Sequence, residues 1–344
     1  MKKLFSTLYI STQETYLSKE RENIVVSLKG RELFRAPVHL INSVVCFGNV
    51  LCSPFLLGFC AENNVSISFF TEYGRFLARV TGPVSGNVLL RKQQYKYSDD
   101  ENFCLETAKS ILIGKLSNSR TVINRALRDH SDKISKADNL KQVSDDLLKS
   151  IENVFNATNL DMLRGMEGDC ANAYFGVFDS LILTGKNKFY MRGRSRRPPE
   201  DNVNCLLSFI YTLLAHDVAS ALEGVGLDPQ VGFFHRDRPG RLSLALDIME
   251  EFRSVIADRL ALTLINLSQL DTKGFKKLST GGVMMNDKNK KIVLEAYRKR
   301  KEEEIFHPFF KENIHIGLLF HAQSLLFARY IRGDIDAYPP FIWK

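Results

Sequence analysis

The sequence predicts an α+β protein in which an N-terminal β-rich, sandwich-like domain precedes a larger all-α domain. Three observations lead to this prediction. Apolar and polar residues alternate over short runs in about the first eighty residues. Glycine and proline interrupt the alternation between residues 81 and 86. Beyond them, apolar residues recur at three- and four-residue spacing. We therefore expect a β domain over residues 1–84 and a helical domain over residues 85–344.

The strands of the first domain follow from the period-two alternation of side chains. The alternation is present over residues 24–29 and 65–70, and it resumes over residues 76–80. Residues 71–74 have the sequence Thr-Glu-Tyr-Gly and supply a turn between the last two runs. We expect those two runs to form a β-hairpin.

One helix interrupts the strands, and helices make up the second domain. Ser53 is a suitable N-cap for an apolar helix over residues 54–61, which has proline at its first position. The helical segments of the second domain are expected at 87–97, 101–116, 121–131, 138–156, 161–183, 203–222, 243–268 and 290–304.

The composition is that of an ordinary globular protein, with 44% hydrophobic and 25% charged residues over 344 positions. The 47 Lys and Arg outnumber the 39 Asp and Glu, and the formal net charge of +8 favours a polyanionic partner. The six cysteines are scattered without a C-x-x-C pair, so we expect buried thiols in a reducing compartment. The N-terminal apolar stretch is too short for a signal peptide, and no segment approaches a membrane span. We expect a cytoplasmic protein with no membrane partner.

An acid lies on the apolar stripe of the fifth helical segment. Leu163, Cys170 and Tyr174 define this stripe, and Glu167 falls on it at helical spacing. A buried carboxylate needs a partner, and a metal ion is one such partner. The alternative is that Glu167 lies at the edge of the stripe and pairs with Arg164.

A run from Val231 to Arg253 combines one histidine, a basic loop and an acid-bearing helix. His235 offers a neutral nitrogen that suits Mn²⁺-like ions and can carry a proton. A single histidine beside aromatic residues is nevertheless more often a satisfied core or loop residue. The assignment of His235 therefore depends on the acids that follow it.

Two of these acids, Asp247 and Glu250, are three residues apart and share one face of the next helix. Together with Glu251 and Asp258 they lie opposite the apolar stripe of that helix. The alternative reading is a solvated acidic face on which Glu250 and Arg253 form an ion pair. For this helix taken alone, that reading is adequate.

Two arginine clusters are able to hold phosphates by bidentate hydrogen bonds. Such contacts position nucleic acid without reading its sequence. A third basic cluster, over residues 288–301, we interpret mainly as a solvated helix with ion pairs. The arginines are Arg192, Arg194, Arg196 and Arg197 in one cluster and Arg236, Arg238 and Arg241 in the loop after His235.

Several separated motifs resemble those of one known family, and they occur in the family's order. They are Leu163–Gly168, Arg196–Asn204 with Leu206–Phe209, the run Val231–Arg253, and the shorter Gly74–Arg79 and Gly114–Arg120. Together they resemble the CRISPR-associated adaptation integrases, metal-dependent nucleases that insert new spacers into CRISPR arrays. The resemblance covers nearly the whole chain, and the chain is most similar to the type I-C version.

The resemblance implies that the helical domain holds Mg²⁺ or Mn²⁺ on a triad of Glu, His and Asp or Glu. By motif, the first glutamate is Glu167 and the histidine is His235. The third ligand is Glu250, the second of two acids three residues apart, and Asp247 is then a supporting acid. Glutamate at the third position is a common variant in the family.

The implied reaction is a transesterification in which the 3′-hydroxyl of a DNA fragment attacks a phosphodiester at the repeat end, in the service of adaptive antiviral defence. The implied partners are double-stranded DNA (prespacer and CRISPR repeat), a second copy of the chain bound through the β domains, a small ferredoxin-like adaptation protein forming a heterohexamer, and an iron–sulfur adaptation nuclease.

Two other classes of function stay open. One is a stand-alone metal-dependent DNase or Holliday-junction nuclease in DNA repair. The other is a non-catalytic nucleic-acid-binding protein whose acids are only a solvated face.

Overall fold

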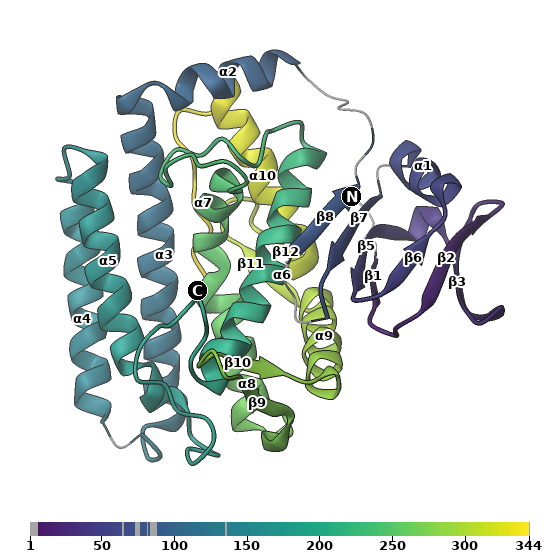
Figure 1. The fold of residues 1–344 in the computed structure, drawn as a ribbon. Helices are drawn as coiled ribbons and strands as arrows, with labels where there is room; N and C mark the ends of the chain where they lie inside the picture. The colour runs from purple at the N-terminus through teal and green to yellow at the C-terminus, as the bar shows by residue number, and fades with distance from the viewer. Residues whose placement is uncertain are drawn as a thin grey trace. The chain divides into compact units, whose positions relative to one another are not determined.

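The computed structural model describes residues 6–63, 65–72, 76–80, 82, 88–134 and 136–343 (Figure 1). The predicted break at 81–86 lies outside the described residues apart from Gly82, and so do residues 73–75 of the predicted turn and of the Gly74–Arg79 motif.

The chain divides into two compact units, and the division differs from the predicted one by two residues at the boundary and by one stretch farther along the chain. The first unit comprises Met1–Gly86 and Asn286–Arg298, and the second comprises the rest of the chain. Residues 286–298 were expected in the helical domain. Instead, Lys290 within this stretch donates to the carbonyl oxygen of Glu72. Such a contact joins segments far apart in the sequence, so local patterns do not reveal it.

Two four-stranded sheets form most of the first unit, with the strand orders β1-β5-β7-β8 and β4-β3-β2-β6. The pairs β1–β5, β5–β7 and β2–β6 are parallel, and the remaining pairs are antiparallel. The elements are β1 (Ser6–Ile10), β2 (Thr15–Glu20), β3 (Asn23–Leu28), β4 (Arg31–Pro37), β5 (Ile41–Phe47), β6 (Val50–Cys52), α1 (Pro54–Glu62), β7 (Ser66–Phe70) and β8 (Phe76–Val80).

Both sheets contribute side chains to one apolar core. Ile10 and Val44 come from the first sheet, Leu17 comes from the second, and Leu56 comes from α1. The sandwich-like prediction is therefore confirmed, as are the strands predicted around β3, β7 and β8. The start of α1 is also confirmed, because Ser53 Oγ accepts the N–H of Leu56 at 3.2 Å.

Helices make up most of the second unit, which confirms the predicted fold class. They are α2 (Val88–Ser98), α3 (Glu101–His130), α4 (Ala137–Val154), α5 (Leu160–Val177), α6 (Asn202–Gly224), α7 (Ser243–Phe252), α8 (Arg259–Asn266), the end of α9 (Asp287–Glu302) and α10 (Ile316–Arg332). Two small antiparallel sheets, which were not predicted, pair β9 (Phe275–Lys277) with β10 (Val283–Met285) and β11 (Glu304–His307) with β12 (Glu312–His315).

Three of the long helices lie side by side in Figure 1: α3, α4 and α5. α3 packs against both of the others and also against α7, while α7 packs against α6. The two segments predicted at 101–116 and 121–131 are one continuous helix, α3. This packing brings residues of α3, α5 and α7 to one place, where the candidate site lies.

In the described part of the chain one helix, α6, is long and apolar enough by composition to cross a membrane, contrary to the expectation that no segment would be. Most of its apolar window is buried inside the unit, against α7, α8 and α10. These contacts are those of a core helix. The six cysteines are all free thiols, and five of them are buried, as predicted.

Candidate active site

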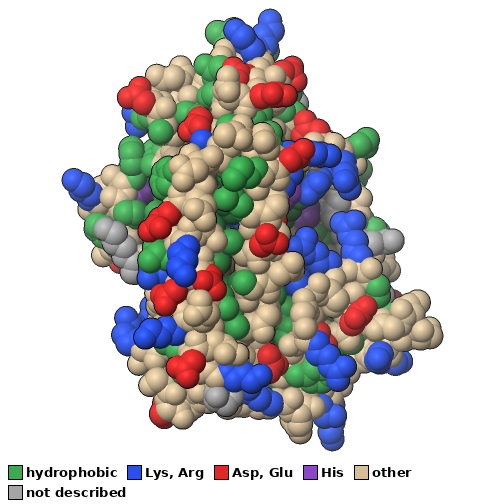
Figure 2. All heavy atoms as spheres, turned by 90° about the vertical axis from the view of Figure 1, so that its left-hand side faces the viewer, with side chains coloured by type: hydrophobic (Ala, Val, Ile, Leu, Met, Phe, Trp, Pro, Cys, Tyr) green, Lys and Arg blue, Asp and Glu red, His purple; other side chains and the backbone are tan. Residues whose placement is uncertain are grey.

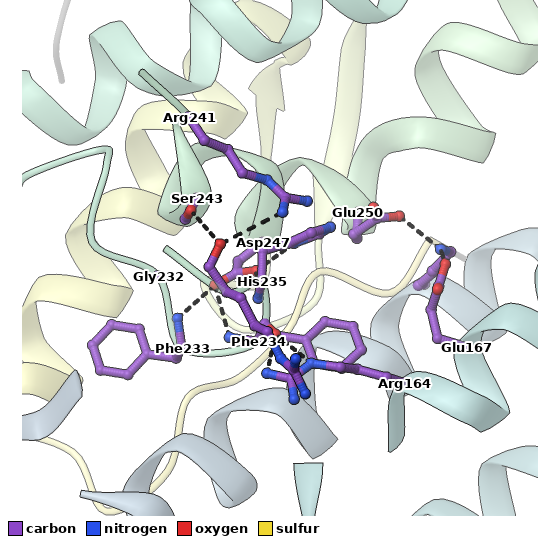
Figure 3. A network of polar contacts seen from close by, with 12 residues as sticks. Arg164, Glu167, Gly232, Phe233, Phe234, His235, Arg241, Ser243, Asp247 and Glu250 are labelled. Carbon is purple, nitrogen blue, oxygen red and sulfur yellow. Dashed lines mark hydrogen bonds and ion pairs between the residues drawn. The ribbon is translucent and has the colours of Figure 1, made fainter. Parts of the chain in front are cut away.

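Glu167 and Glu250 converge on one lysine ammonium group (Figure 3). Lys115 on α3 forms an ion pair with Glu167 on α5, and its Nζ lies 2.9 Å from Glu250 Oε2 on α7. The alternative that Glu167 lies at the edge of the stripe is borne out by its 26% exposure, but its ion-pair partner is Lys115, whereas Arg164 binds Asp161 at 2.7 Å. The arrangement thus places two carboxylates from different helices around one positive charge.

The second of these carboxylates is buried and held in its charged form. The side chain of Glu250 is 2% exposed, and its Oε1 lies 3.1 Å from Arg253 NH1. Burial alone would raise the pKa of Glu250, but Arg253 and Lys115 outweigh it and hold the pKa below the ordinary range. The predicted ion pair with Arg253 is therefore confirmed. Glu250 Oε2 has Lys115 at 2.9 Å as its ion-pair partner, so any other cation at this oxygen would compete with that ammonium.

The predicted alternative of a solvated acidic face is wrong. Asp247, Glu251 and Asp258 are all at most 1% exposed. The helix predicted over 243–268 is interrupted by a π-helical turn at Arg253–Asp258. This irregularity and the packing of α7 against both α3 and α6 bury the face that the regular pattern left in solvent.

Asp247 organises the loop that carries the histidine. Its carboxylate accepts the backbone N–H groups of Phe233 at 2.7 Å, Phe234 at 3.0 Å and His235 at 2.9 Å. The backbone at Gly232 comes so close that a Cβ atom there would lie 2.9 Å from Asp247 Oδ2. Glycine is needed at this position because of that approach.

The imidazole of His235 is oriented by the same carboxylate. Nδ1 lies 2.6 Å from Asp247 Oδ1. The Asp247 oxygens act as acceptors toward the loop, so we assign the proton of neutral His235 to Nδ1, which donates to Asp247. The lone pair of Nε2 is then available to a metal ion or a proton. Figure 3 shows the His235 ring in contact with the Asp247 carboxylate, near Glu250.

The donor set suits a hard divalent cation in its chemistry. Two carboxylates and one imidazole are ligands that Mn²⁺ and Mg²⁺ accept, and they leave positions for water and a phosphate oxygen. A cation already lies between Glu167 and Glu250, namely the ammonium of Lys115. Among the described residues, no three His, Cys, Asp or Glu side chains are close enough together to hold a metal in this arrangement. The residues fit such an ion in charge and donor type, and the acids would have to exchange their lysine for it.

A second buried acid, Asp258, lies beneath the site in the π-helical turn. Its carboxylate accepts the hydroxyl of Tyr211 at 2.5 Å and that of Tyr174 at 3.1 Å. Burial raises the pKa of Asp258 to about 6, and the two hydroxyls and nearby arginines only partly oppose this effect.

The raised pKa of Asp258 predicts a pH dependence of stability. The folded carboxyl holds its proton more tightly than the unfolded one, so the folded state loses about 3 kcal/mol as pH rises from about 4 through 6. Asp258→Asn removes this loss. We expect the variant to gain about 3 kcal/mol in free energy of unfolding over wild type between about pH 4 and pH 7. Urea unfolding at both pH values measures it, with exposed Asp237→Asn as the control, and a difference independent of pH would contradict the assignment.

Sequence patterns missed Lys115, although they contain a signal for it. Ile111, Leu112 and Leu116 are buried on α3, and Lys115 is only 8% exposed among them. A lysine on an apolar helical stripe needs a partner for the same reason that Glu167 did.

The arginines proposed to hold phosphate are not equivalent in the structure. Arg196 and Arg197 are exposed, as are Arg236 and Arg238 in the loop. Arg194 instead binds Asn204 Oδ1 at 2.8 Å and Ser208 Oγ at 3.1 Å, and its guanidinium stacks over Tyr211.

The other arginines are partly engaged at the surface. Arg192 is exposed beside Tyr190, Arg236 pairs with Asp161 at 2.9 Å, and Arg241 is half-buried. A hollow beside the acid pair is lined by Lys115, Arg196 and Arg253 among others. On the side of α4 and α5 turned to the viewer in Figure 2, Lys and Arg side chains gather toward one edge, where histidine is also visible. This part of the molecule suits an anionic ligand.

The fold and the site define an α+β protein whose helical unit gathers buried acids and a histidine, and comparison with known proteins shows the family. The profile of the family CRISPR associated protein Cas1 matches residues 8–299. A curated relative, CRISPR-associated endonuclease Cas1 1 of Chlorobaculum tepidum, is 52% identical over 344 residues and is covered in full, as is this chain. The chain belongs to the Cas1 family.

Another relative is joined to a second nuclease. The CRISPR-associated exonuclease Cas4/endonuclease Cas1 fusion of Geobacter sulfurreducens is 33% identical over 98% of this chain and 60% of its own length.

Solved structures share the fold at lower sequence identity. A CAS1 protein from Thermotoga maritima has a TM-score of 0.81 at 24% identity, with 96% of this chain and 97% of that chain covered. A casposase bound to integration product has a TM-score of 0.85 at 18% identity, with 99% and 95% covered. A chain of a Cas6-RT-Cas1–Cas2 complex has a TM-score of 0.82 at 22% identity, with all of this chain and 36% of that chain covered.

Proposed function

We propose that the chain is a metal-dependent DNA endonuclease and integrase that inserts new spacers into a CRISPR array. The observation that carries the proposal is the convergence of Glu167 and Glu250 on one cation, beside a histidine held by Asp247. Family membership supports it, since the relatives are named CRISPR-associated endonucleases. The casposase of the same fold is bound to an integration product.

Glu167, His235 and Glu250 would hold Mg²⁺ or Mn²⁺. When bound, such an ion supplies Lewis-acid stabilisation of the charge on the phosphate. The chain's own residues supply position. His235 would hold the ion through Nε2, because Nδ1 is bound to Asp247, and the same nitrogen can accept a proton only when no ion is on it. Asp247 keeps the ring in place as a positioning residue, and Arg253 keeps the Glu250 carboxylate ionised.

DNA is the proposed substrate, and the loop arginines, of which Arg236 and Arg238 are exposed and Arg241 is half-buried, are proposed to hold its backbone. Replacing Arg236, Arg238 and Arg241 together by alanine is expected to weaken binding to any duplex sequence. It should also reduce the slope of log K against log salt by about 2 to 3, because each lost phosphate contact removes about 0.9. Fluorescence anisotropy at several salt concentrations measures both quantities.

The matched control for this triple variant is Arg128, Lys141 and Lys149 to alanine, since these are also exposed cations of the helical unit and two of them also pair with a neighbouring acid. An equal loss of slope in the two triple variants would contradict a specific role of the loop.

The partners are also proposals. A homodimer formed through the β domains, a small ferredoxin-like adaptation protein in a heterohexamer and an iron–sulfur adaptation nuclease are expected for a type I-C member. The Cas1–Cas2 complex and the Cas4/Cas1 fusion among the comparisons support the last two. Cross-linking of the purified chain with each candidate tests these contacts.

The leading alternative is a stand-alone DNase or Holliday-junction nuclease that uses the same acids. Incubating the protein with Mn²⁺, a labelled DNA fragment and a repeat-containing plasmid distinguishes integration from cleavage. Covalent joining of the label at the repeat ends supports the integrase. Cleavage of branched DNA without joining would support the repair nuclease. The burial of Asp247, Glu250 and Asp258 disfavours the non-catalytic alternative, which assumed a solvated acidic face.

A further inference from the structure

We infer that Lys115 is an internal counter-ion that exchanges with the divalent cation. In the metal-free protein its ammonium holds Glu167 and Glu250 together, and cation binding releases it from both carboxylates. The inference rests on the proposed function, because it takes Mg²⁺ or Mn²⁺ as the ligand of this site.

The position of Lys115 is what an exchanging cation requires. Its side chain is 11% exposed, and it contacts one carboxylate oxygen of Glu167 and one of Glu250. These are the two acids expected to bind the metal, and a divalent ion between them would take the same oxygens. The ammonium and the metal ion therefore compete for one place.

Electrostatics explains why a cation is needed there before metal arrives. Two carboxylates that face each other repel, and here one of them, Glu250, is also buried and loses its hydration, while Glu167 is partly exposed. Arg253 pairs with Glu250 at its other oxygen, Oε1. Among the described residues, Lys115 is the only hydrogen-bond partner of the Glu167 carboxylate. Without Lys115 the pair would have to separate or take up a proton.

Lysine suits this exchange better than arginine would. Its charge is compact and sits on a flexible four-carbon chain, whereas a guanidinium would bind a carboxylate in a rigid bidentate fork. Lys115 also lines a small hollow whose polar lining residues include Ser119, Ser254 and Asp258, and the ammonium is proposed to turn toward these oxygens. The net free energy of metal binding is then the free energy of binding to the acids less the free energy needed to displace the lysine.

Lys115→Met tests the exchange by calorimetry with Mn²⁺ alone and by thermal unfolding. The variant is expected to bind Mn²⁺ at least about tenfold more tightly than wild type, because no ammonium has to leave. Its metal-free melting temperature should be lower, and Mn²⁺ should raise it by more than in wild type. Lys115→Arg, which keeps the charge, should not bind Mn²⁺ more tightly than wild type.

Lys301→Met is the matched control. Lys301 forms an ion pair of 2.9 Å with Asp217, and both side chains are 14% exposed. This variant loses a similarly sheltered lysine within the same unit. It should lower the melting temperature with Mn²⁺ affinity unchanged.

The outcomes separate the inference from the proposed function. If wild type binds Mn²⁺ and Lys115→Met binds it no more tightly, the inferred exchange of Lys115 with the metal ion is wrong, while the proposed metal site is supported. If neither protein binds Mn²⁺, the metal site and the exchange both fail.

A measurement on the wild-type protein covers the case in which Lys115→Met does not fold. An amine-acylating reagent and mass spectrometry report the reactivity of Lys115 with and without Mn²⁺. Release from the acids should raise that reactivity several-fold, while Lys301 reacts equally in both conditions. Unchanged reactivity of Lys115 at saturating Mn²⁺ would overturn the exchange.

Discussion

Glutamine in place of Glu167, or alanine in place of His235, is expected to abolish Mn²⁺-dependent strand transfer, with a loss of at least about 10²- to 10³-fold in rate. Each change removes one donor of the proposed metal site. Glu167→Gln keeps the size of the side chain and removes the charge that attracts the cation. Single-turnover joining of a labelled DNA fragment to a repeat-containing plasmid measures the effect.

The fold should survive both substitutions, because the side chains of Glu167 and His235 are 26% and 21% exposed. Circular dichroism and urea unfolding check this. Glu152→Gln, an exposed glutamate on α4, is the matched control and should keep full activity. If either variant joins DNA at the wild-type rate, the residue replaced in it is not part of the proposed metal site.

Asp247→Ala is expected to lower the free energy of unfolding by about 3–5 kcal/mol. The carboxylate is fully buried, and its loss leaves the N–H groups of Phe233, Phe234 and His235 without their acceptor. It also leaves the imidazole without the partner that orients it. The variant should lose strand transfer even at temperatures where it stays folded.

Urea unfolding measures the stability, and Asp237→Ala is the control, since Asp237 is an exposed acid of the same loop. Asp237 accepts only a 3.3 Å hydrogen bond from Gly232 among the described contacts. Its removal should cost no more than about 1 kcal/mol. A similar cost for the two variants would contradict the organising role of Asp247.

Local sequence patterns predicted the features that depend only on residues near one another in the chain. The alternation in β3, β7 and β8, the Ser53 cap of α1 and the position of Glu167 on an apolar stripe can all be read from short windows of sequence. α10 was not among the predicted helices, and its start carries no capping signal, since His315 precedes it and makes no side-chain cap hydrogen bond.

The division of α3 into two predicted segments has a physical reason. Ser117, Asn118 and Ser119 are poor helix formers and suggest a break. In the fold, Asn118 donates to the carbonyl oxygens of Glu251 at 2.7 Å and Phe341 at 2.8 Å. A contact with residues more than a hundred positions away thus keeps the helix continuous, and no local window contains it.

In the candidate site, too, contacts between residues far apart in the sequence could not be predicted from local patterns. Residue types and spacing marked Glu167, His235, Asp247 and Glu250 only as candidates, and the resemblance assigned their roles. The structure brings Glu167 and Glu250 onto one lysine. The burial of the acids could not be predicted, because it depends on the packing of α7 against α3 and on the π-helical turn after it. The roles of Glu167, His235 and Glu250 as metal ligands stay a prediction.

The most direct test of this central claim is anomalous diffraction from crystals of the protein soaked in Mn²⁺. We predict a manganese peak within coordinating distance of Glu167, His235 and Glu250, with Lys115 turned away from both acids. A peak bound elsewhere, or none at these three residues at a millimolar concentration of Mn²⁺, would contradict the account.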